Sequence, residues 1–419
     1  MSNAENEQDV LQTEIKRLPA KELIKRIGPG MVLTGVIIGP GSITTAAMIG
    51  SRFGYQLMWL LIVIAIMNSV FVLANYRISL LTNEPVITVI RNNFGFVPAF
   101  ICGISAAISG GAWTIGNITG AGMGLSLIIP FSWQIGAVIM VVLCILIMFL
   151  KGVYKKVEKV ITVCVLAMLV CFLIAVIASG GPNWGEFFKG LFTPKFPDGS
   201  FAMALAIVST SATITAGMYG TYLGKEKKWK VADIFNGSAA VDTTSHAVSV
   251  SLITLLIMMT GAIVLNPQGA VIQSPAQLAD LLRPALGDFA PIVMGISILG
   301  AAFSSLLGTS QRTAVLALDG IGKPYGLDRM ATKIFGAIII VIGLIVALIV
   351  GSNPVQLMLT AQIATAIATP LSGIFIILAL FKKKINAGYK TPVILIIFVI
   401  ASYLVALGLT VNTVIGFFK

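Results

Sequence analysis

The sequence predicts an all-α integral membrane protein with eleven transmembrane helices. Of its 419 residues, 57% are hydrophobic and 11% are charged, and the mean hydropathy is +0.98. A soluble domain carries about 25% charged residues, and a spanning helix needs about 20 mostly apolar residues. The apolar runs of that length are 29–53, 56–81, 95–128, 132–150, 158–180, 199–223, 240–266, 287–310, 332–352, 354–381 and 391–417.

The distribution of basic residues predicts how these spans are oriented. With the N-terminus placed in the cytoplasm, most of the 28 Lys and Arg residues fall into the N-terminal tail and the cytoplasmic loops, including 151–159, 225–230, 312–333 and 382–390. Cytoplasmic loops carry an excess of positive charge, so this bias also explains the net charge of +12 without any nucleic-acid partner. We expect a multi-pass plasma-membrane protein with a cytoplasmic N-terminus and an outside C-terminus. The basic residues left outside are Arg52, Lys189, Lys195, Arg283 and Lys419.

The chain is expected to form one membrane domain without a soluble enzyme domain. Its four cysteines lie in apolar runs without metal-ligand spacing, and no nucleotide-binding loop or Ser/His/Asp cluster is visible. These features predict a secondary transporter or channel that is not an enzyme, needs no cofactor, sits as a monomer in the lipid bilayer and carries an ion or small solute. The expected parts are a cytoplasmic tail (1–27), a first group of five spans (28–180), an extracellular loop (181–198), a second group of five spans (199–381) and a last span (382–419). The two groups of five spans are expected to be inverted repeats of each other, for the reason given next.

Two spans are interrupted near their centres. The first contains Gly39-Pro40-Gly41-Ser42, and the sixth crowds small and hydroxylated residues into 209–220, where Gly217 and Gly220 are expected to loosen the helix. Backbone at membrane depth is tolerated without helical hydrogen bonds only where it lines a cavity or is buried in protein. Interrupted spans at corresponding places in two halves indicate an inverted-repeat transporter with its site at the midplane. A simple proline kink is the alternative for the first span.

The order of short motifs resembles the NRAMP family of divalent-metal transporters over most of the chain. This resemblance implies a LeuT-type 5+5 inverted repeat with broken helices 1 and 6, which moves divalent metal ions. The motifs are Pro29-Gly30, Pro40-Gly41, FGYQLMW at 53–59, GAGMGL at 120–125, GVYKKVEKVI at 152–161, GISILGAAFSSLLGT at 295–309 and LTAQIATAIATPLSG at 359–373.

The resemblance also implies which residues bind the substrate, and the sequence departs from the family there. The family motif Asp-Pro-Gly-Asn aligns with Gly39 to Ser42, and Ala-x-x-Met-Pro-His aligns with Ala212 to Gly217, where Thr215 replaces the methionine. A second family histidine falls on Tyr222, and the acidic pair linked to proton transfer falls on Thr114 and Asn117. The implied substrate-binding residues are Gly39, Ser42, Ala212, Thr215, Gly217 and Gln362, of which Ser42, Ala212, Thr215 and Gln362 would be the metal ligands.

Three functions stay open for this substituted site. A hydrated Mg²⁺ ion suits hydroxyl and amide donors better than Mn²⁺ or Fe²⁺, which favour carboxylate with softer ligands. The alternative is a small organic or anionic solute, favoured by helix N-termini and by the volume expected from small side chains at Gly39, Thr215 and Gly217. Na⁺ coupling would use Ser304 and Ser305, which resemble a LeuT-type sodium site, although ordinary helix packing also explains a serine pair. The third is a sensor on a transporter scaffold.

Two polar residues of the seventh span are further candidates. His246, the single histidine, could relay protons together with Asp242, which we expect in the cytoplasmic vestibule. A hydrogen-bonded core position is the alternative for His246. Thr114 and Asn117 lie one turn apart and are expected to line the outward path. The small residues at 120–124 are expected to permit close helix packing instead of binding a ligand.

Overall fold

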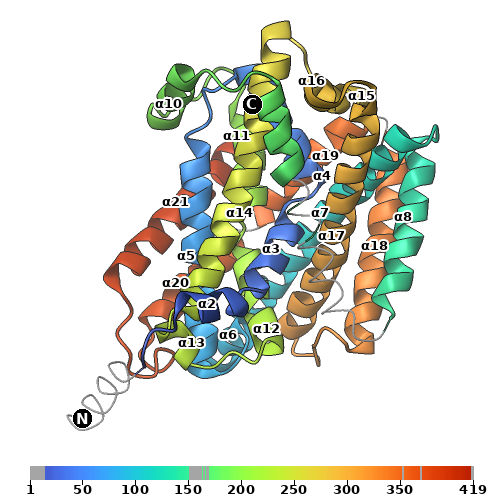
Figure 1. Cartoon of the computed structure of the whole chain (residues 1–419). Coiled ribbons are helices and arrows are strands. Elements are labelled where there is room, and N and C mark those ends of the chain that lie inside the picture. Colours follow the sequence, from blue (N-terminus) through green and yellow to red (C-terminus); the bar gives the residue numbers. More distant parts are fainter. Residues whose placement is uncertain are drawn as a thin grey trace.

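The structure is entirely helical in the part of the chain that it describes. The computed structural model describes residues 15–150, 163, 166, 169–351, 353–368 and 370–416 (Figure 1). Within them, 8 helices are long and apolar enough to cross a membrane, and one bent pair of helices makes a ninth span. Shorter apolar helices at Trp133–Met148 and Leu169–Ala178 complete the eleven predicted segments. The prediction of an all-α multi-pass membrane protein is therefore confirmed.

The helices follow one another along the chain with short connections. The first half contains α2 (Ala20–Arg26), α3 (Pro29–Ile37), α4 (Pro40–Phe53), α5 (Leu60–Thr82), α6 (Val86–Phe94), α7 (Phe96–Ile128) and α8 (Trp133–Met148). Next come α10 (Trp184–Phe192), α11 (Phe201–Ser211), α12 (Ile214–Glu226), α13 (Ala232–Phe235), α14 (Ser238–Thr260) and a π-helical turn, η1 (Gly261–Leu265). Short turns follow: η2 (Asn266–Gln268), α15 (Pro275–Ala279), η3 (Asp280–Leu282), α16 (Arg283–Leu286) and η4 (Gly287–Phe289). The last group is α17 (Ala290–Gly320), α18 (Met330–Val350), α19 (Pro354–Ala368), α20 (Pro370–Phe381) and α21 (Val393–Gly416).

The first span is broken between α3 and α4, which meet at an angle of 63°. Ile38 leaves the helix and Gly39 is extended (φ −110°, ψ 177°). Pro40 then occupies the first position of α4, where its missing N–H and fixed φ favour a helix start. The predicted break is confirmed, but it lies earlier than expected, because Gly41 and Ser42 already belong to α4.

The sixth span is broken between α11 and α12, at Ala212 and Thr213. The expectation that Gly217 loosens the helix is wrong, since this residue lies inside α12. A Cβ atom added at Gly217 would lie 2.8 Å from Nδ2 of Asn75 and 2.9 Å from the carbonyl oxygen of Phe71. The glycine therefore allows α12 to approach α5 closely, and it leaves no additional pocket volume.

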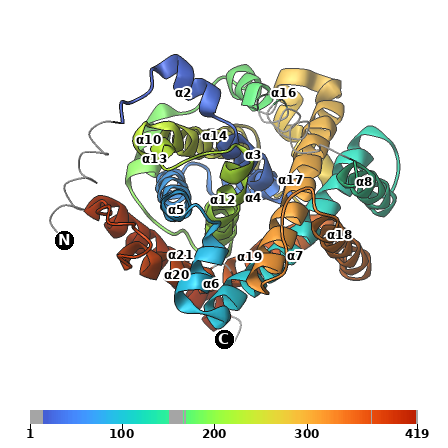
Figure 2. The same ribbon diagram turned by 90° about the horizontal axis from the view of Figure 1, so that it is seen from below.

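Two long helices, α7 and α17, pack against each other along the bundle (Figure 2). They contact each other through glycines near both ends. A Cβ atom added at Gly103 would lie 2.8 Å from the Cα atom of Gly320, and one added at Gly124 would lie 3.1 Å from the carbonyl oxygen of Gly295. Small residues thus permit close packing of membrane helices, as predicted for 120–124.

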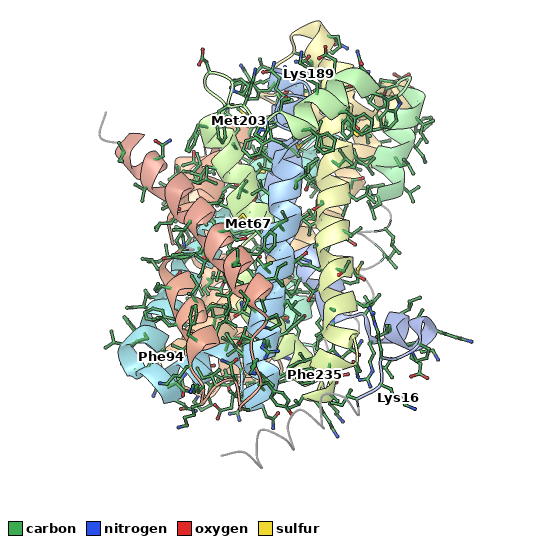
Figure 3. The ribbon with its side chains drawn as sticks, turned by 90° about the vertical axis from the view of Figure 1, so that its left-hand side faces the viewer. Lys16, Met67, Phe94, Lys189, Met203 and Phe235 are labelled. Carbon is green, nitrogen blue, oxygen red and sulfur yellow. The ribbon has the colours of Figure 1, made fainter. Side chains whose placement is uncertain are left out.

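The predicted loops separate to opposite ends of the bundle. At the end that carries α2, α6 and α13, hereafter the α6 end, Arg26 pairs with Asp233 (3.5 Å), and Lys382 donates to the backbone carbonyl of Asn93. At the opposite end, hereafter the α10 end, the carbonyl of Lys195 accepts a hydrogen bond from Trp59 (3.2 Å). Figure 3 shows Lys16, Phe94 and Phe235 at the α6 end and Lys189 at the α10 end. The structure therefore separates these loops into two ends, and the assignment of the α6 end to the cytoplasm stays a prediction.

The eighth span is longer than predicted. The sequence pattern ends this span at residue 310 and places Arg312 in a cytoplasmic loop, but α17 continues to Gly320 and buries Arg312 at 1% exposure. The charged residue interrupts the apolar run in the sequence, whereas the helix continues through Val315 and Leu316. The basic loop 151–159 and the motif at 152–161 lie outside the described residues, as do Lys419 and most of the first half of the predicted span 158–180.

Candidate functional site

The last turn of α3 leaves no free carbonyl at the first break. Each of its final three carbonyl oxygens accepts a hydrogen bond from a serine hydroxyl, one from α4 and two from α17. These groups form a cluster around the break, hereafter the break cluster. The bonds join Ser304 Oγ to the Gly35 carbonyl (3.2 Å), Ser305 Oγ to the Val36 carbonyl (2.7 Å) and Ser42 Oγ to the Ile37 carbonyl (3.0 Å).

The space beside Gly39 is filled by side chains of α7 and α17. Asn117 donates from Nδ2 to Oγ of Ser305 (2.9 Å). A Cβ atom added at Gly39 would lie 2.6 Å from Oδ1 of Asn117 and 2.9 Å from Oγ of Ser305. The expectation of additional pocket volume at Gly39 is therefore wrong, because neighbouring polar groups occupy the place of a side chain.

Gln362 of α19 connects the two halves of the candidate site. Its Oε1 accepts a hydrogen bond from Thr45 of α4 (3.0 Å), and its backbone carbonyl accepts one from Ser209 of α11 (3.5 Å). Its Nε2 is packed against Gly41 and has no hydrogen-bond partner among the described residues, although the side chain is only 4% exposed. Gln362 thus lies against both broken spans with an unused donor.

The second break is held by an asparagine that the sequence analysis missed. Nδ2 of Asn68 in α5 donates to the carbonyl of Ser211, the last residue of α11. The hydroxyls of Thr213 and Thr215 lie 2.8 Å apart, and Ala212 is buried between the two helices. An asparagine within an apolar span is itself a signal, and it could have identified this contact.

Asp242 lies at the start of α3, outside the break cluster. Its two carboxylate oxygens accept hydrogen bonds from the backbone N–H groups of Gly28 (2.9 Å) and Gly30 (2.8 Å), and Tyr76 donates to it as well (3.1 Å). A carboxylate at a helix N-terminus satisfies orphan N–H groups and stabilises the helix dipole. Asp242 is completely buried, so the expected place in an open vestibule is wrong in this structure.

His246 lies one turn further along α14. Its Nδ1 lies 2.9 Å from the hydroxyl oxygen of Thr34, and that hydroxyl donates its hydrogen to the carbonyl of Gly30. Nε2 of His246 has no partner within the described residues, and the ring is fully buried. Asp242 and His246 of α14 therefore both bind α3. These contacts join α14 to the start of the broken span.

A second polar network closes the α6 end of the bundle. Asp319 of α17 accepts hydrogen bonds from Tyr222 (2.5 Å) and Thr88 (2.9 Å) and forms an ion pair with Arg91. Tyr325 lies 3.0 Å from the hydroxyl of Thr88, and burial raises the pKa of this tyrosine, which stays protonated. The network ties α6, α12 and α17 together around Tyr222, the position that the resemblance aligns with a family histidine.

Thr114 lies apart from Asn117. Its hydroxyl donates to the carbonyl of Gly110 in its own helix (2.8 Å), and its methyl group lies 2.9 Å from the place of a Cβ atom at Gly343 in α18. The expectation that the two residues line one path is wrong in this structure, because they contact different helices.

The donor set of the site favours hard or neutral ligands. The described residues contain no group of three or more His, Cys, Asp or Glu side chains that could hold a metal ion. What the two breaks offer is hydroxyl, amide and carbonyl oxygen, together with the N-termini of α4 and α12. Such groups can replace water around a hard cation, or orient a polar solute, but they cannot supply a balancing negative charge.

Two broken helices at the centre of a helical bundle, with a polar site between them and no nucleotide-binding motif, define a membrane transporter of the inverted-repeat class. The chain matches the family described as Nramp, natural resistance-associated macrophage protein-like, over residues 30–416. It therefore belongs to the Nramp family. Members of this family are membrane transporters, so the chain is a multi-pass transporter and not an enzyme.

Similar proteins agree with this assignment. The chain is 22% identical over 375 residues to the divalent metal cation transporter MntH of Klebsiella pneumoniae, covering 86% of this chain and 87% of MntH. It is 23% identical over 298 residues to the uncharacterized membrane protein YcsG of Bacillus subtilis, covering 70% of each.

Solved structures share the fold. A manganese transporter of Eremococcus coleocola superposes with a TM-score of 0.78 at 18% identity, covering 96% of this chain and 90% of that one. The transporter MhsT, solved in complex with L-phenylalanine, gives a TM-score of 0.63 at 18% identity, with 92% and 97% covered. These neighbours confirm the LeuT-type fold expected from the two broken spans.

Proposed function

We propose that this chain is a secondary transporter that moves a divalent cation across the membrane by alternating access. The observation that carries the proposal is the convergence of oxygen donors on the two helix breaks, where Gln362 contacts both broken spans. Relatives named as divalent metal or manganese transporters support it.

The donor set favours a cation that keeps part of its hydration shell. Mg²⁺ gives up water reluctantly and is bound through its waters, whereas Mn²⁺ and Fe²⁺ favour carboxylates with softer donors. The hydroxyls of Ser42 and Thr215, the carbonyl of Ala212 and the amide of Gln362 are the groups that would hold such an ion. No carboxylate lies among them, so a bare divalent ion would be costly to bury.

The two breaks would serve as hinges. The half-helices α3 and α12 can tilt against the rest of the bundle, and the network around Asp319 would open when the α6 end releases its cargo. We place the N-terminus and the α6 end in the cytoplasm and the C-terminus outside a plasma membrane, because the basic loops gather at this end. Residues 28–180 and 199–381 would be the two inverted repeats, and the protein would act as a monomer.

A small organic or anionic solute is the second candidate, favoured by the same lack of a carboxylate. In this case Na⁺ would provide the coupling. Ser304 and Ser305 already contact the carbonyls of Gly35 and Val36. Rotation of the two hydroxyl groups would free both carbonyl oxygens. The two carbonyl oxygens and the two hydroxyl oxygens would then be available to one ion, and oxygen donors of this kind suit the coordination of sodium.

Uptake into proteoliposomes tests the first candidate against the second. We expect the protein to take up Mg²⁺. Mn²⁺ and Ca²⁺ serve as comparison ions, and the uptake of each ion is measured with and without a Na⁺ or pH gradient. Gln362→Ala should reduce uptake about tenfold, the usual effect of losing one well-placed polar contact. Gln356→Ala, an exposed glutamine on the same helix, should leave it unchanged. If no divalent ion is taken up under any gradient, the cation proposal is wrong, and equal effects of both variants would mean that the site lies elsewhere.

A further inference from the structure

Helix α17 carries a stripe of polar residues at intervals of two turns. Ser305 lies in the break cluster, Arg312 follows seven residues later, and Asp319 follows after seven more in the network at the α6 end. Seven residues make nearly two full turns and about 10 Å of rise, so the three side chains lie on one face of the helix. Arg312 is therefore halfway between the break cluster and the closing network.

The guanidinium of Arg312 has no countercharge in the described part of the chain. Arg312 is 1% exposed, and neither its Nη1 nor its Nη2 has a hydrogen-bond partner among the described residues. None of the ion pairs formed by described residues includes it. Asp319, two turns away, is already bound by Arg91. The guanidinium carbon of Arg312 lies 4.9 Å from the centroid of the Trp113 ring, and Tyr219 is a second neighbour.

Two further unused donors lie on the same turn of α17 as Arg312. Thr309 and Thr313 lie three residues before and one residue after Arg312 on the same helix. Both are completely buried, and the hydroxyl oxygens of both have no partner among the described residues. This part of α17 thus carries a positive charge beside Trp113 and two buried hydroxyls without a partner among the described residues, and all three side chains can donate hydrogen bonds.

The burial of Arg312 without a countercharge among the described residues indicates that its guanidinium binds a ligand. A charge removed from water is retained in a membrane protein when it binds an opposite charge or marks the path of a ligand. Contact with an aromatic ring offsets part of the free energy needed to remove a guanidinium from water, but it does not neutralise the positive charge. A planar guanidinium with two free Nη groups matches a carboxylate, and its charge also suits a halide.

We propose that Arg312, with the hydroxyls of Thr309 and Thr313, binds a small monovalent anion on the path between the break cluster and the α6 end. The anion is a halide or a small carboxylate. It neutralises the buried positive charge of Arg312. The site is independent of the nature of the cargo, and its existence does not depend on the proposed cation transport.

Trp113 provides a direct readout in the purified full-length protein. Bromide quenches tryptophan fluorescence on contact. Exposed tryptophans such as Trp184 are quenched in proportion to bromide concentration, whereas a bound bromide beside Trp113 adds a saturable component. We expect this component in the wild-type protein and its loss in Trp113→Phe.

The arginine variants decide the proposal. Arg312→Gln should weaken the saturable component at least about tenfold, because the charge-assisted bonds are lost, and Arg312→Lys should retain it. Arg283→Gln, which changes an exposed arginine at the α10 end, should behave as wild type. Displacement by acetate identifies a carboxylate site, and displacement by chloride alone identifies a halide site.

Two results would overturn the anion site: no saturable component in the wild-type protein, or an unchanged one in Arg312→Gln. Since the assay contains no divalent ion, either result leaves the uptake experiment unaffected. Conversely, a failure of cation uptake leaves the bromide titration unaffected.

Discussion

Replacing Gly39 by alanine tests how tightly the break cluster is packed. The new Cβ atom would lie 2.6 Å from Oδ1 of Asn117, whereas ordinary contact begins near 3.4 Å. The asparagine must then move by about 0.8 Å, which stretches its 2.9 Å hydrogen bond to Ser305. We expect the variant to be less stable than the wild type.

The expected loss follows from these contacts. Weakening a buried hydrogen bond between two groups without access to water costs about 1–3 kcal/mol. Alanine also restricts the unfolded chain, which offsets about 0.4–1 kcal/mol. The net loss is about 1–2 kcal/mol, or a decrease of about 1–2 °C in the thermal midpoint for a chain of this length.

Thermal unfolding of the purified protein in detergent measures this loss, with Gly111→Ala as the matched control. Gly111 is a helical glycine of α7 with no neighbouring atom within 4 Å of an added Cβ, so this change should not destabilise the protein. Asn117→Ala combined with Gly39→Ala should cost about 1–2 kcal/mol less than the sum of the single changes. Equal midpoints for Gly39→Ala and Gly111→Ala, or simple additivity in the double variant, would refute the reasoning.

Two further changes probe the ends of the bundle. Asp242→Asn replaces one of the two carboxylate oxygens that accept backbone N–H bonds by an NH2 donor, so one of these bonds is lost and the protein should be destabilised by about 1–3 kcal/mol. Asp288→Asn, at an exposed position, is the control, and equal denaturation midpoints would contradict the capping role. Tyr222→Phe removes a donor to Asp319 and should open the α6 end, seen as faster labelling of a cysteine introduced beneath the network. Unchanged labelling would show that this hydrogen bond does not hold the end closed.

Much of the fold is predictable from composition and pattern. The spans follow from runs of apolar residues, and the first break follows from adjacent proline and glycine. The extension of α17 is not predictable in this way, because Arg312 resembles the end of a span when hydropathy is read alone. Only the packing against Trp113 and α7 shows that the charged residue stays inside the bundle.

The site is predictable in its position but less so in its contacts. Ser304, Ser305 and Gln362 do lie at the breaks, where the motif resemblance places them. The sequence could not show that Asn117 turns toward Ser305 while Thr114, one turn away, turns toward α18, because the direction of each side chain depends on how α7 crosses its neighbours. The glycine at position 39 suggested free volume, yet close approach of other helices uses that volume completely.

The serine hydroxyls at the end of α3 have a consequence for the unloaded protein. A broken helix would ordinarily leave carbonyl oxygens unpaired whenever the cargo is absent, and such a state would be strained and short-lived. In this protein the hydroxyls of Ser42, Ser304 and Ser305 donate hydrogen bonds to those oxygens, so the end of α3 is satisfied without a bound ligand. The broken helix end therefore needs no ligand to keep its hydrogen bonds, and any ligand that used these carbonyl oxygens would first have to replace three hydrogen bonds.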